Sequence, residues 1–109
     1  MLRVGNHAVA MDHHVYFWLK DENKNAADRT AFEKGLAGLF EIPEVLGGRW
    51  AVPAKMEPRP VLDQSWDYAI TMQFDGMAGH DVYQEHPLHK QFLEDFRSWW
   101  AQVQIKDLA

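Results

Sequence analysis

The segment from His13 to Lys20, HHVYFWLK, limits most strongly what this chain can fold into. It is rich in β-branched and aromatic residues and is followed by a polar run, which predicts a strand. Side chains alternate between the two faces of a strand. One face would carry His13, Val15, Phe17 and Leu19, and the other would carry His14, Tyr16, Trp18 and Lys20. Because both faces are largely apolar, both need to be covered.

Three other segments have the composition and periodicity of strands. The segment 67–74 alternates most regularly, with Tyr68, Ile70, Met72 and Phe74 on one face. The segment 45–52 contains a glycine pair that indicates a bend, and the segment 102–108 alternates apolar with polar residues. The sequence therefore predicts strands over 13–20, 45–52, 67–74 and 102–108.

Two regions between these strands predict helices. Apolar residues recur at helical spacing in 26–41, Asn25 stands at a capping position, and Pro43 marks the end. The second region covers 77–85, breaks at His86-Pro87 and starts again at Pro87, a favoured first-turn residue. Its apolar stripe consists of Leu88, Phe92, Phe96, Trp99 and Trp100.

The predicted order is strand, helix, strand, strand, helix, strand. With right-handed crossovers, this order folds most simply into a ferredoxin-like α+β domain, a βαββαβ chain with a four-stranded antiparallel sheet and its helices on one face. The other sheet face would then be an apolar patch larger than monomers usually expose. Two such sheets packed face to face would cover it, so we expect a homodimer that forms a dimeric α/β barrel.

Length and charge restrict the domain organisation and the partners. The chain has 109 residues, which is enough for one domain; we assign residues 1–11 to an N-terminal extension and 12–109 to the domain. The formal net charge is −5, the wrong sign for binding phosphate backbones or anionic lipid. We therefore expect no nucleic-acid partner and no membrane partner.

The compartment is predicted from what the sequence lacks. The chain contains no cysteine, which excludes disulfides, thiolate nucleophiles and cysteine-ligated metals. Residues 1–10 contain no apolar stretch of signal-peptide length, and no segment approaches the roughly 20 apolar residues of a membrane span. We expect a cytoplasmic protein.

Six histidines fall into two groups that a folded domain can bring together. The groups are His7, His13 and His14, and His80, His86 and His89. Histidine acts as a general base, a general acid or a metal ligand, although solvated or structural imidazoles are more common. His86 and His89 would need His13 or Asp81 as a third ligand to hold zinc. We therefore predict no metal site.

Tyr83 and His89 are the best candidates for chemistry. Both would lie near the end of the third strand, where a phenol and an imidazole facing one apolar cavity can donate a hydrogen bond and accept a proton. The alternative is that Tyr83 packs in the core with its hydroxyl bonded to His89. Four further residues are candidates for contacting a bound ligand, although such side chains more often form the core: Phe17, Trp50, Tyr68 and Met72.

Common catalytic signatures are absent. Neither serine lies in a Gly-x-Ser-x-Gly motif, and the phosphate-binding and dinucleotide-binding glycine motifs do not occur. The sequence therefore predicts no cofactor.

The segment Tyr83-Gln84-Glu85-His86-Pro87-Leu88-His89, together with His13, Ile42-Pro43 and a final strand reaching Asp107, resembles the stress-responsive dimeric α/β-barrel family, often called Dabb. The resemblance runs from about Asp12 to Leu108. It implies a ferredoxin-like fold whose sheets pair into a barrel in a homodimer, the same architecture that the element order predicts.

The resemblance also implies roles for individual residues. A plant polyketide cyclase of similar fold uses a tyrosine and a histidine that match Tyr83 and His89, so His89 would remove a proton next to a carbonyl and Tyr83 would orient or polarise the substrate. His13 would face the same cavity. The cyclase has a histidine on its third strand where this sequence places Tyr68, which is a departure from its pattern.

Three functions stay open at this point. The favoured one is a stress-responsive homodimer that binds a small apolar or aromatic molecule. The first alternative is a cyclase-like or lyase-like enzyme with His89 as its base, and the second is a purely structural stress protein. The sequence leaves open whether the chain is an enzyme.

Overall fold

The first strand, β1 (Met11–Leu19), lies inside a four-stranded sheet with the strand order β2-β3-β1-β4. The computed structural model describes residues 10–109. β1 pairs antiparallel with β3 (Tyr68–Phe74) and with β4 (Trp100–Leu108), and β3 pairs antiparallel with β2 (Gly47–Ala51). The predicted four-stranded antiparallel sheet is confirmed.

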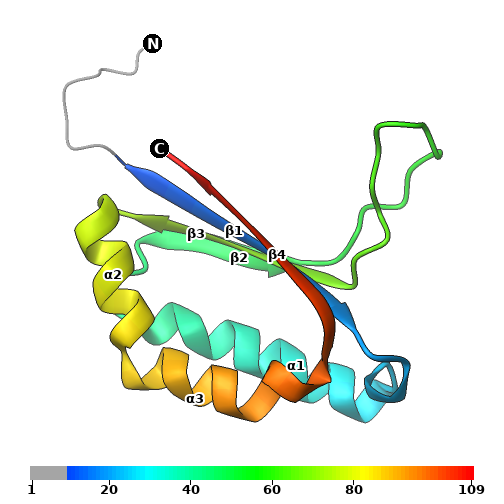
Figure 1. The fold of residues 1–109 in the computed structure, drawn as a ribbon, viewed down its shortest axis with the longest axis horizontal. Coiled ribbons are helices and arrows are strands. Elements are labelled where there is room, and N and C mark those ends of the chain that lie inside the picture. Colours follow the sequence, from blue (N-terminus) through cyan, green and yellow to red (C-terminus); the bar gives the residue numbers. More distant parts are fainter. Residues whose placement is uncertain (1–9) are drawn as a thin grey trace.

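Three helices cover one face of this sheet (Figure 1). They are α1 (Ala26–Gly38), α2 (Met77–Glu85) and α3 (Pro87–Phe96). Single turns of 3₁₀ helix, η1 (Asp21–Asn23), η2 (Leu39–Glu41) and η3 (Arg97–Trp99), complete the element order. The order and the one-sided layer of helices confirm the ferredoxin-like α+β fold.

Local chemistry explains where the helices begin. The Asn25 side chain accepts a hydrogen bond from the Asp28 backbone N–H at 2.8 Å, as predicted for the cap of α1. Between α2 and α3, Pro87 occupies the first turn of α3, and the His86 ring accepts the Leu88 N–H at 3.1 Å. This break lets the chain turn between two short helices.

Several predicted boundaries shift in the structure. β1 starts at Met11, which is buried, and residues 1–9 of the predicted extension lie outside the described residues. α1 ends at Gly38 because its last predicted turn tightens into η2. Trp100, predicted in the helical stripe, instead starts β4.

One predicted core residue is exposed. Leu88 is 41% accessible because the first turn of α3 places it away from the sheet. Phe92 and Phe96, four and eight residues further on, are buried. The predicted apolar stripe therefore begins one turn later.

The core lies between the sheet and the helices. Alternate residues of β1 point into it: Met11, His13, Val15, Phe17 and Leu19. From β3 come Tyr68, Ile70, Met72 and Phe74, all of them 1% exposed or less. The faces predicted for these two strands are confirmed.

The opposite sheet face mixes aromatic with polar residues. His14, Tyr16 and Trp18 of β1 are half-buried, and the β4 residues paired with His14 and Tyr16 are the exposed Lys106 and Gln104. The long connection between β2 and β3 reaches over this face: the Trp66 ring lies 5.4 Å from the Tyr16 ring, and Trp18 donates to Ser65 at 3.0 Å. This connection leaves much of the face open.

None of the helices in residues 10–109 combines the length and the apolarity needed to cross a bilayer.

Candidate functional site

A cavity of about 160 Å³ lies between the sheet and the helices. His13 comes from β1, Tyr83 from the last turn of α2, and His89 from the first turn of α3, and all three line this cavity. Most of the remaining wall is apolar: Val15, Phe17, Leu39, Ile70, Phe92, Leu93, Trp100, Val103 and Ile105. The structure therefore brings the three candidate catalytic residues to one cavity, which is partly open where Val103 and Ile105 of β4 line it.

The α2–α3 break sets the geometry of Tyr83 and His89. Their ring centroids lie 4.6 Å apart, with the planes tilted by 57°. His89 Nδ1–H donates to the Gln84 carbonyl at 3.1 Å, which leaves Nε2 as the unprotonated ring nitrogen of the neutral imidazole. No hydrogen bond joins the Tyr83 hydroxyl to His89 among the residues that the structure describes. The two rings are in contact, and the hydroxyl keeps its capacity to donate.

Burial shifts the pKa values of both groups in directions that favour their neutral forms. It lowers the pKa of His89 below the usual 6.5, partly opposed by the hydrogen bond to the Gln84 carbonyl. It raises the pKa of Tyr83 well above its usual value. At neutral pH, His89 is therefore a neutral proton acceptor and Tyr83 a protonated donor.

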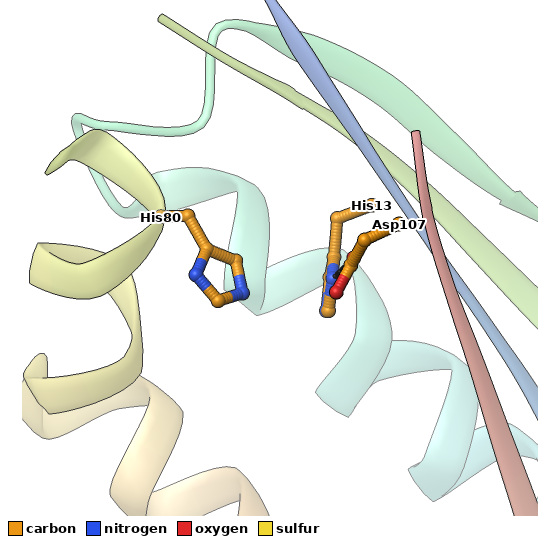
Figure 2. Close-up of side chains that lie close together, drawn as sticks. All are labelled: His13, His80 and Asp107. Carbon is orange, nitrogen blue, oxygen red and sulfur yellow. Dashed lines mark hydrogen bonds and ion pairs between the residues drawn. The ribbon is translucent and has the colours of Figure 1, made fainter. Parts of the chain in front are cut away.

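A second polar group adjoins the cavity at His13. The His13 Nδ1–H donates to the Asp107 carboxylate at 2.5 Å, and the His80 ring lies 5.1 Å from the His13 ring (Figure 2). Burial lowers the pKa of His13, although the contact with Asp107 works against this shift. His13 thus faces both the cavity and a histidine of α2.

The histidines of the two predicted groups meet only in part. His13 and His80 come together, and His89 lies beside Tyr83, whose ring is 6.0 Å from that of His13. His14 points to the opposite sheet face and His86 caps α3. His7 lies outside the described residues.

Of the four residues predicted to contact a ligand, the structure places Phe17 in the cavity wall. The other three, Trp50, Tyr68 and Met72, are not among its lining residues. Met72 is fully buried, and the Trp50 ring packs 6.0 Å from the Tyr68 ring.

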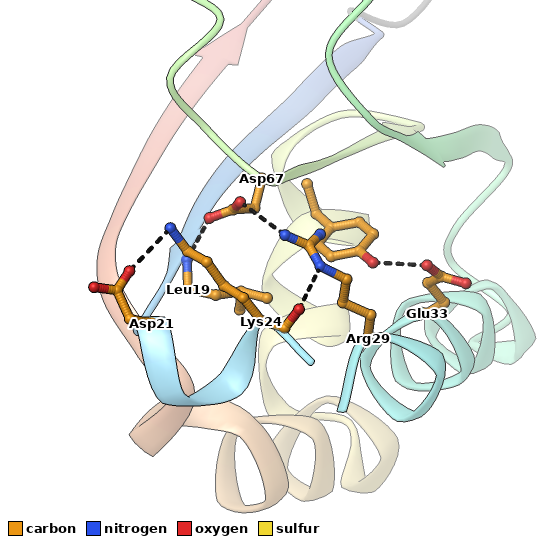
Figure 3. Close-up of polar contacts among 7 residues, drawn as sticks. Leu19, Asp21, Lys24, Arg29, Glu33 and Asp67 are labelled. Carbon is orange, nitrogen blue, oxygen red and sulfur yellow. Dashed lines mark hydrogen bonds and ion pairs between the residues drawn. The ribbon is translucent and has the colours of Figure 1, made fainter. Parts of the chain in front are cut away.

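Tyr68 belongs to a separate polar network with Arg29 and Glu33. Figure 3 shows Arg29 and Glu33 of this network together with Asp67. The Tyr68 hydroxyl donates to Glu33 at 2.6 Å, and the Arg29 guanidinium lies over the Tyr68 ring at 5.5 Å. Arg29 also contacts Asp67 at 3.3 Å, and Asp67 accepts the Leu19 N–H at 2.8 Å. This network joins α1 to β1 and to the start of β3.

The Trp100 indole N–H is buried without a hydrogen-bond partner in residues 10–109, and Trp100 lines the cavity. The sequence pattern had placed Trp100 in a helical apolar stripe. Sequence reasoning missed His80, which it treated as solvated or structural, and the β4 wall residues Val103 and Ile105. The alternation of β4 was visible in the sequence, and its pairing with β1 is what turns these residues toward the cavity.

The sheet, its one-sided layer of helices and the cavity between them define a ferredoxin-like α+β domain. Residues 11–109 match the stress responsive A/B barrel domain family, Dabb, and the chain belongs to this family. The family resemblance of the Tyr83–His89 segment is thereby confirmed.

Solved structures share the fold. A dimeric ferredoxin-like protein of unknown function from Thermobifida fusca has a TM-score of 0.78 at 19% identity, covering 98% of this chain and 96% of that chain. A protein from Arabidopsis thaliana has a TM-score of 0.76 at 21% identity, covering 91% and 93%. A hydroxynitrile lyase from Passiflora edulis has a TM-score of 0.78 at 15% identity, covering 93% of each chain. A search of curated proteins finds no match.

Proposed function

We propose that this chain is a homodimer that binds a small, mainly aromatic molecule in the cavity between sheet and helices. The observation that carries the proposal is the cavity itself, about 160 Å³ in volume, with a largely apolar wall. An apolar cavity of roughly 150 Å³ holds benzene, so this space suits a ligand built on one aromatic ring. Tyr83, His89 and the unpartnered Trp100 N–H supply the few polar groups that orient a ligand in such a site.

The test is a thermal-shift titration with single-ring aromatic compounds, including phenols and aryl ketones. A ligand at about 100 times its Kd should stabilise the native protein by roughly 2.7 kcal/mol, with saturation. Val103→Phe fills the cavity from β4 and should abolish the shift. Val61→Phe is the matched control, because Val61 is 89% exposed and not among the cavity residues. If none of these compounds stabilises the protein with saturation, the proposed ligand binding is contradicted and the purely structural role is favoured.

The homodimer part of the proposal rests on uncovered surface. On the open sheet face, Leu108 of β4 is exposed and the aromatic residues Tyr16 and Trp18 of β1 are only half-buried. The relatives from Thermobifida fusca and Jannaschia are described as dimeric ferredoxin-like proteins. Light scattering at micromolar concentration should give about twice the 12.7 kDa chain mass. A monomer mass would rule the dimer out.

The cytoplasm remains the compartment that we expect.

A second candidate function is catalysis by proton abstraction, and the Tyr83–His89 geometry favours it. His89 Nε2 would take a proton from a carbon next to a carbonyl group. The electrons of the broken C–H bond then form the enolate, and the Tyr83 O–H donates to its oxygen. The hydroxynitrile lyase of similar fold is an enzyme by its description. The resemblance to a plant polyketide cyclase points to the same two residues, because that enzyme uses a tyrosine and a histidine that match Tyr83 and His89.

Deuterium exchange tests this chemistry without knowledge of the complete reaction. Aryl methyl ketones are incubated with the protein in D₂O, and loss of the α-proton signal is followed by NMR. Exchange above the buffer rate should disappear in His89→Ala, with His14→Ala as a control histidine on the opposite sheet face. Undiminished exchange in His89→Ala would remove His89 from the mechanism.

A further inference from the structure

A cluster of two imidazoles and one carboxylate lies beside the cavity and is not used by the proposed binding or proton transfer. His13, His80 and Asp107 each offer one ligand atom, and these atoms all lie within 4.8 Å of one another. Figure 2 shows the His80 ring directed at the His13–Asp107 pair. No other group of this kind occurs in residues 10–109.

The fold holds two of these residues rigidly. His13 and Asp107 are directly opposite each other in the antiparallel pairing of β1 with β4, so their side chains leave the same face of the sheet side by side. His80 comes from the first turn of α2, which packs on this face, and its ring also contacts the Phe74 ring at 5.6 Å. Donors carried by strands and helices are held more firmly than donors on loops.

Distances within the cluster are close to those of a metal site. A tetrahedral zinc ion binds nitrogen and oxygen at about 2.0–2.2 Å, so its ligand atoms lie roughly 3.3–3.6 Å from one another. Ligand atoms as far as 4.8 Å apart need to close by about 1 Å, whereas the His13–Asp107 pair, which starts at 2.5 Å, needs to open by about 1 Å. The Asp107 side chain has room for this movement because it is 41% exposed, while its backbone is held in β4.

Further contacts orient the His80 ring. One ring nitrogen lies 3.3 Å from the Asp81 carboxylate and the other lies 3.2 Å from the Gln84 amide. A metal-binding histidine commonly uses one nitrogen for the ion and the other for a carboxylate or amide that fixes the ring. Asp81 can fill this outer role at Nδ1, while Nε2 would exchange its contact with the Gln84 amide for the ion.

We propose that His13, His80 and Asp107 form a binding site for a divalent transition-metal ion, with zinc as the best match. Two imidazoles and one carboxylate suit zinc and related ions better than magnesium or calcium, which prefer oxygen ligands. Three protein ligands also leave at least one coordination position open. Because His13 lines the cavity and the Tyr83 ring is 6.0 Å from it, the bound ion would lie at the cavity wall.

This site differs from the one considered from sequence. The spacing of His86 and His89 would have required His13 or Asp81 as a third ligand, and we predicted no metal site there. In the structure, His86 caps α3 and His89 donates to a carbonyl, so both have other contacts. His80 and Asp107 take their place beside His13.

Zinc affinity of the full chain, measured by competition with a chromophoric chelator, tests the proposal. We expect one Zn²⁺ per chain and a loss of affinity of at least about tenfold in His80→Ala and in Asp107→Asn. His14→Ala is the matched control, because its side chain lies on the opposite face of β1. Circular dichroism establishes that each variant is folded, and the two ligand variants serve as independent tests.

Cobalt gives a second readout. Co²⁺ bound at this site should show visible absorption bands that disappear in His80→Ala and persist in His14→Ala. Equal zinc affinity in all variants would mean adventitious binding to surface side chains and would overturn the proposal. Magnesium binding as tight as zinc binding would also contradict it, because imidazole ligands would then contribute nothing. The measurement needs no organic ligand, so its outcome is independent of the cavity proposal.

Discussion

Tyr83 and His89 face each other across the break between α2 and α3, with ring centroids 4.6 Å apart. They are six positions apart in the chain, and the His86-Pro87 step between the helices turns both rings toward the same cavity. The His89 ring is fixed by its donation to the Gln84 carbonyl. A short stretch of sequence therefore builds a donor–acceptor pair at the wall of an apolar space.

Tyr83→Phe should separate function from stability. The change removes the hydroxyl and keeps the ring contact with His89, and no partner of this hydroxyl is found among residues 10–109. The free energy of unfolding should therefore change by less than about 1 kcal/mol. Ketone proton exchange should fall by about 10²-fold or more, because the enolate loses its donor. Urea unfolding and the NMR exchange assay measure the two effects, and a loss of several kcal/mol with intact exchange would show that the hydroxyl is structural.

His89 should make stability depend on pH in a definite direction. Burial lowers its pKa in the folded state below the usual 6.5, so the unfolded chain binds a proton more readily. The free energy of unfolding should then fall as the pH drops below about 6.5, until the folded-state pKa is reached, and should be unaffected by His89 above that range. His89→Gln should show a smaller loss between about pH 6.5 and 5. Urea titrations with a chelator present measure this, and parallel pH profiles of parent and variant would exclude His89 as the source.

Trp100 should discriminate between ligands by their hydrogen-bond acceptors. Its buried N–H has no partner in the part of the chain that the structure describes, and an acceptor on a bound ring would satisfy it. In Trp100→Phe, we expect an aryl ketone to lose affinity by about five- to tenfold, while a hydrocarbon of the same size keeps its affinity. Titration of both probes against both proteins isolates the contribution of the N–H. Equal losses for the two probes would mean that the indole acts only through its size.

The two glycines of α1 should respond in opposite directions to replacement by alanine. A Cβ at Gly35 would lie 2.3 Å from Cε2 of Phe96, whose ring is held by Phe32 and Trp99, whereas a Cβ at Gly38 meets nothing within 4 Å. Gly35→Ala should therefore destabilise the protein by about 1–3 kcal/mol. Gly38→Ala should stabilise it by up to about 1 kcal/mol. Urea midpoints measure both, and a stabilising Gly35→Ala would show that α1 and α3 can separate at this point.

Much of this fold follows from periodicity. The alternation in β1 and β3 and the Pro87 start of α3 are local signals, and the structure confirms them. The predictions fail where a tertiary contact replaces a local pattern. Trp100 shares helical spacing with Phe96, yet it pairs opposite Leu19 as a β4 residue. Leu88 also fits the helical spacing, but it lies in the first turn of α3 and is exposed. The buried positions of this stripe begin at Phe92.

The site was predictable only where its members are close in sequence. Tyr83 and His89 belong to one motif, so their proximity was expected. His80 was not grouped with His13 and Asp107, because only the packing of α2 against β1 and β4 brings the three together. Tyr68 was expected to contact a ligand, but its hydroxyl bonds to Glu33, a contact that depends on how α1 crosses the sheet.

The pairing of the first strand with the last has a consequence for synthesis. His13 and Asp107 are 94 residues apart, and β4 supplies both one edge of the sheet and part of the cavity wall. A nascent chain on the ribosome therefore holds β1 with one unpaired edge until β4 has emerged. An exposed strand edge pairs readily with other chains. Termination before Trp100 would thus yield a fragment prone to aggregation, because the sheet can close only once β4 is available to pair with β1.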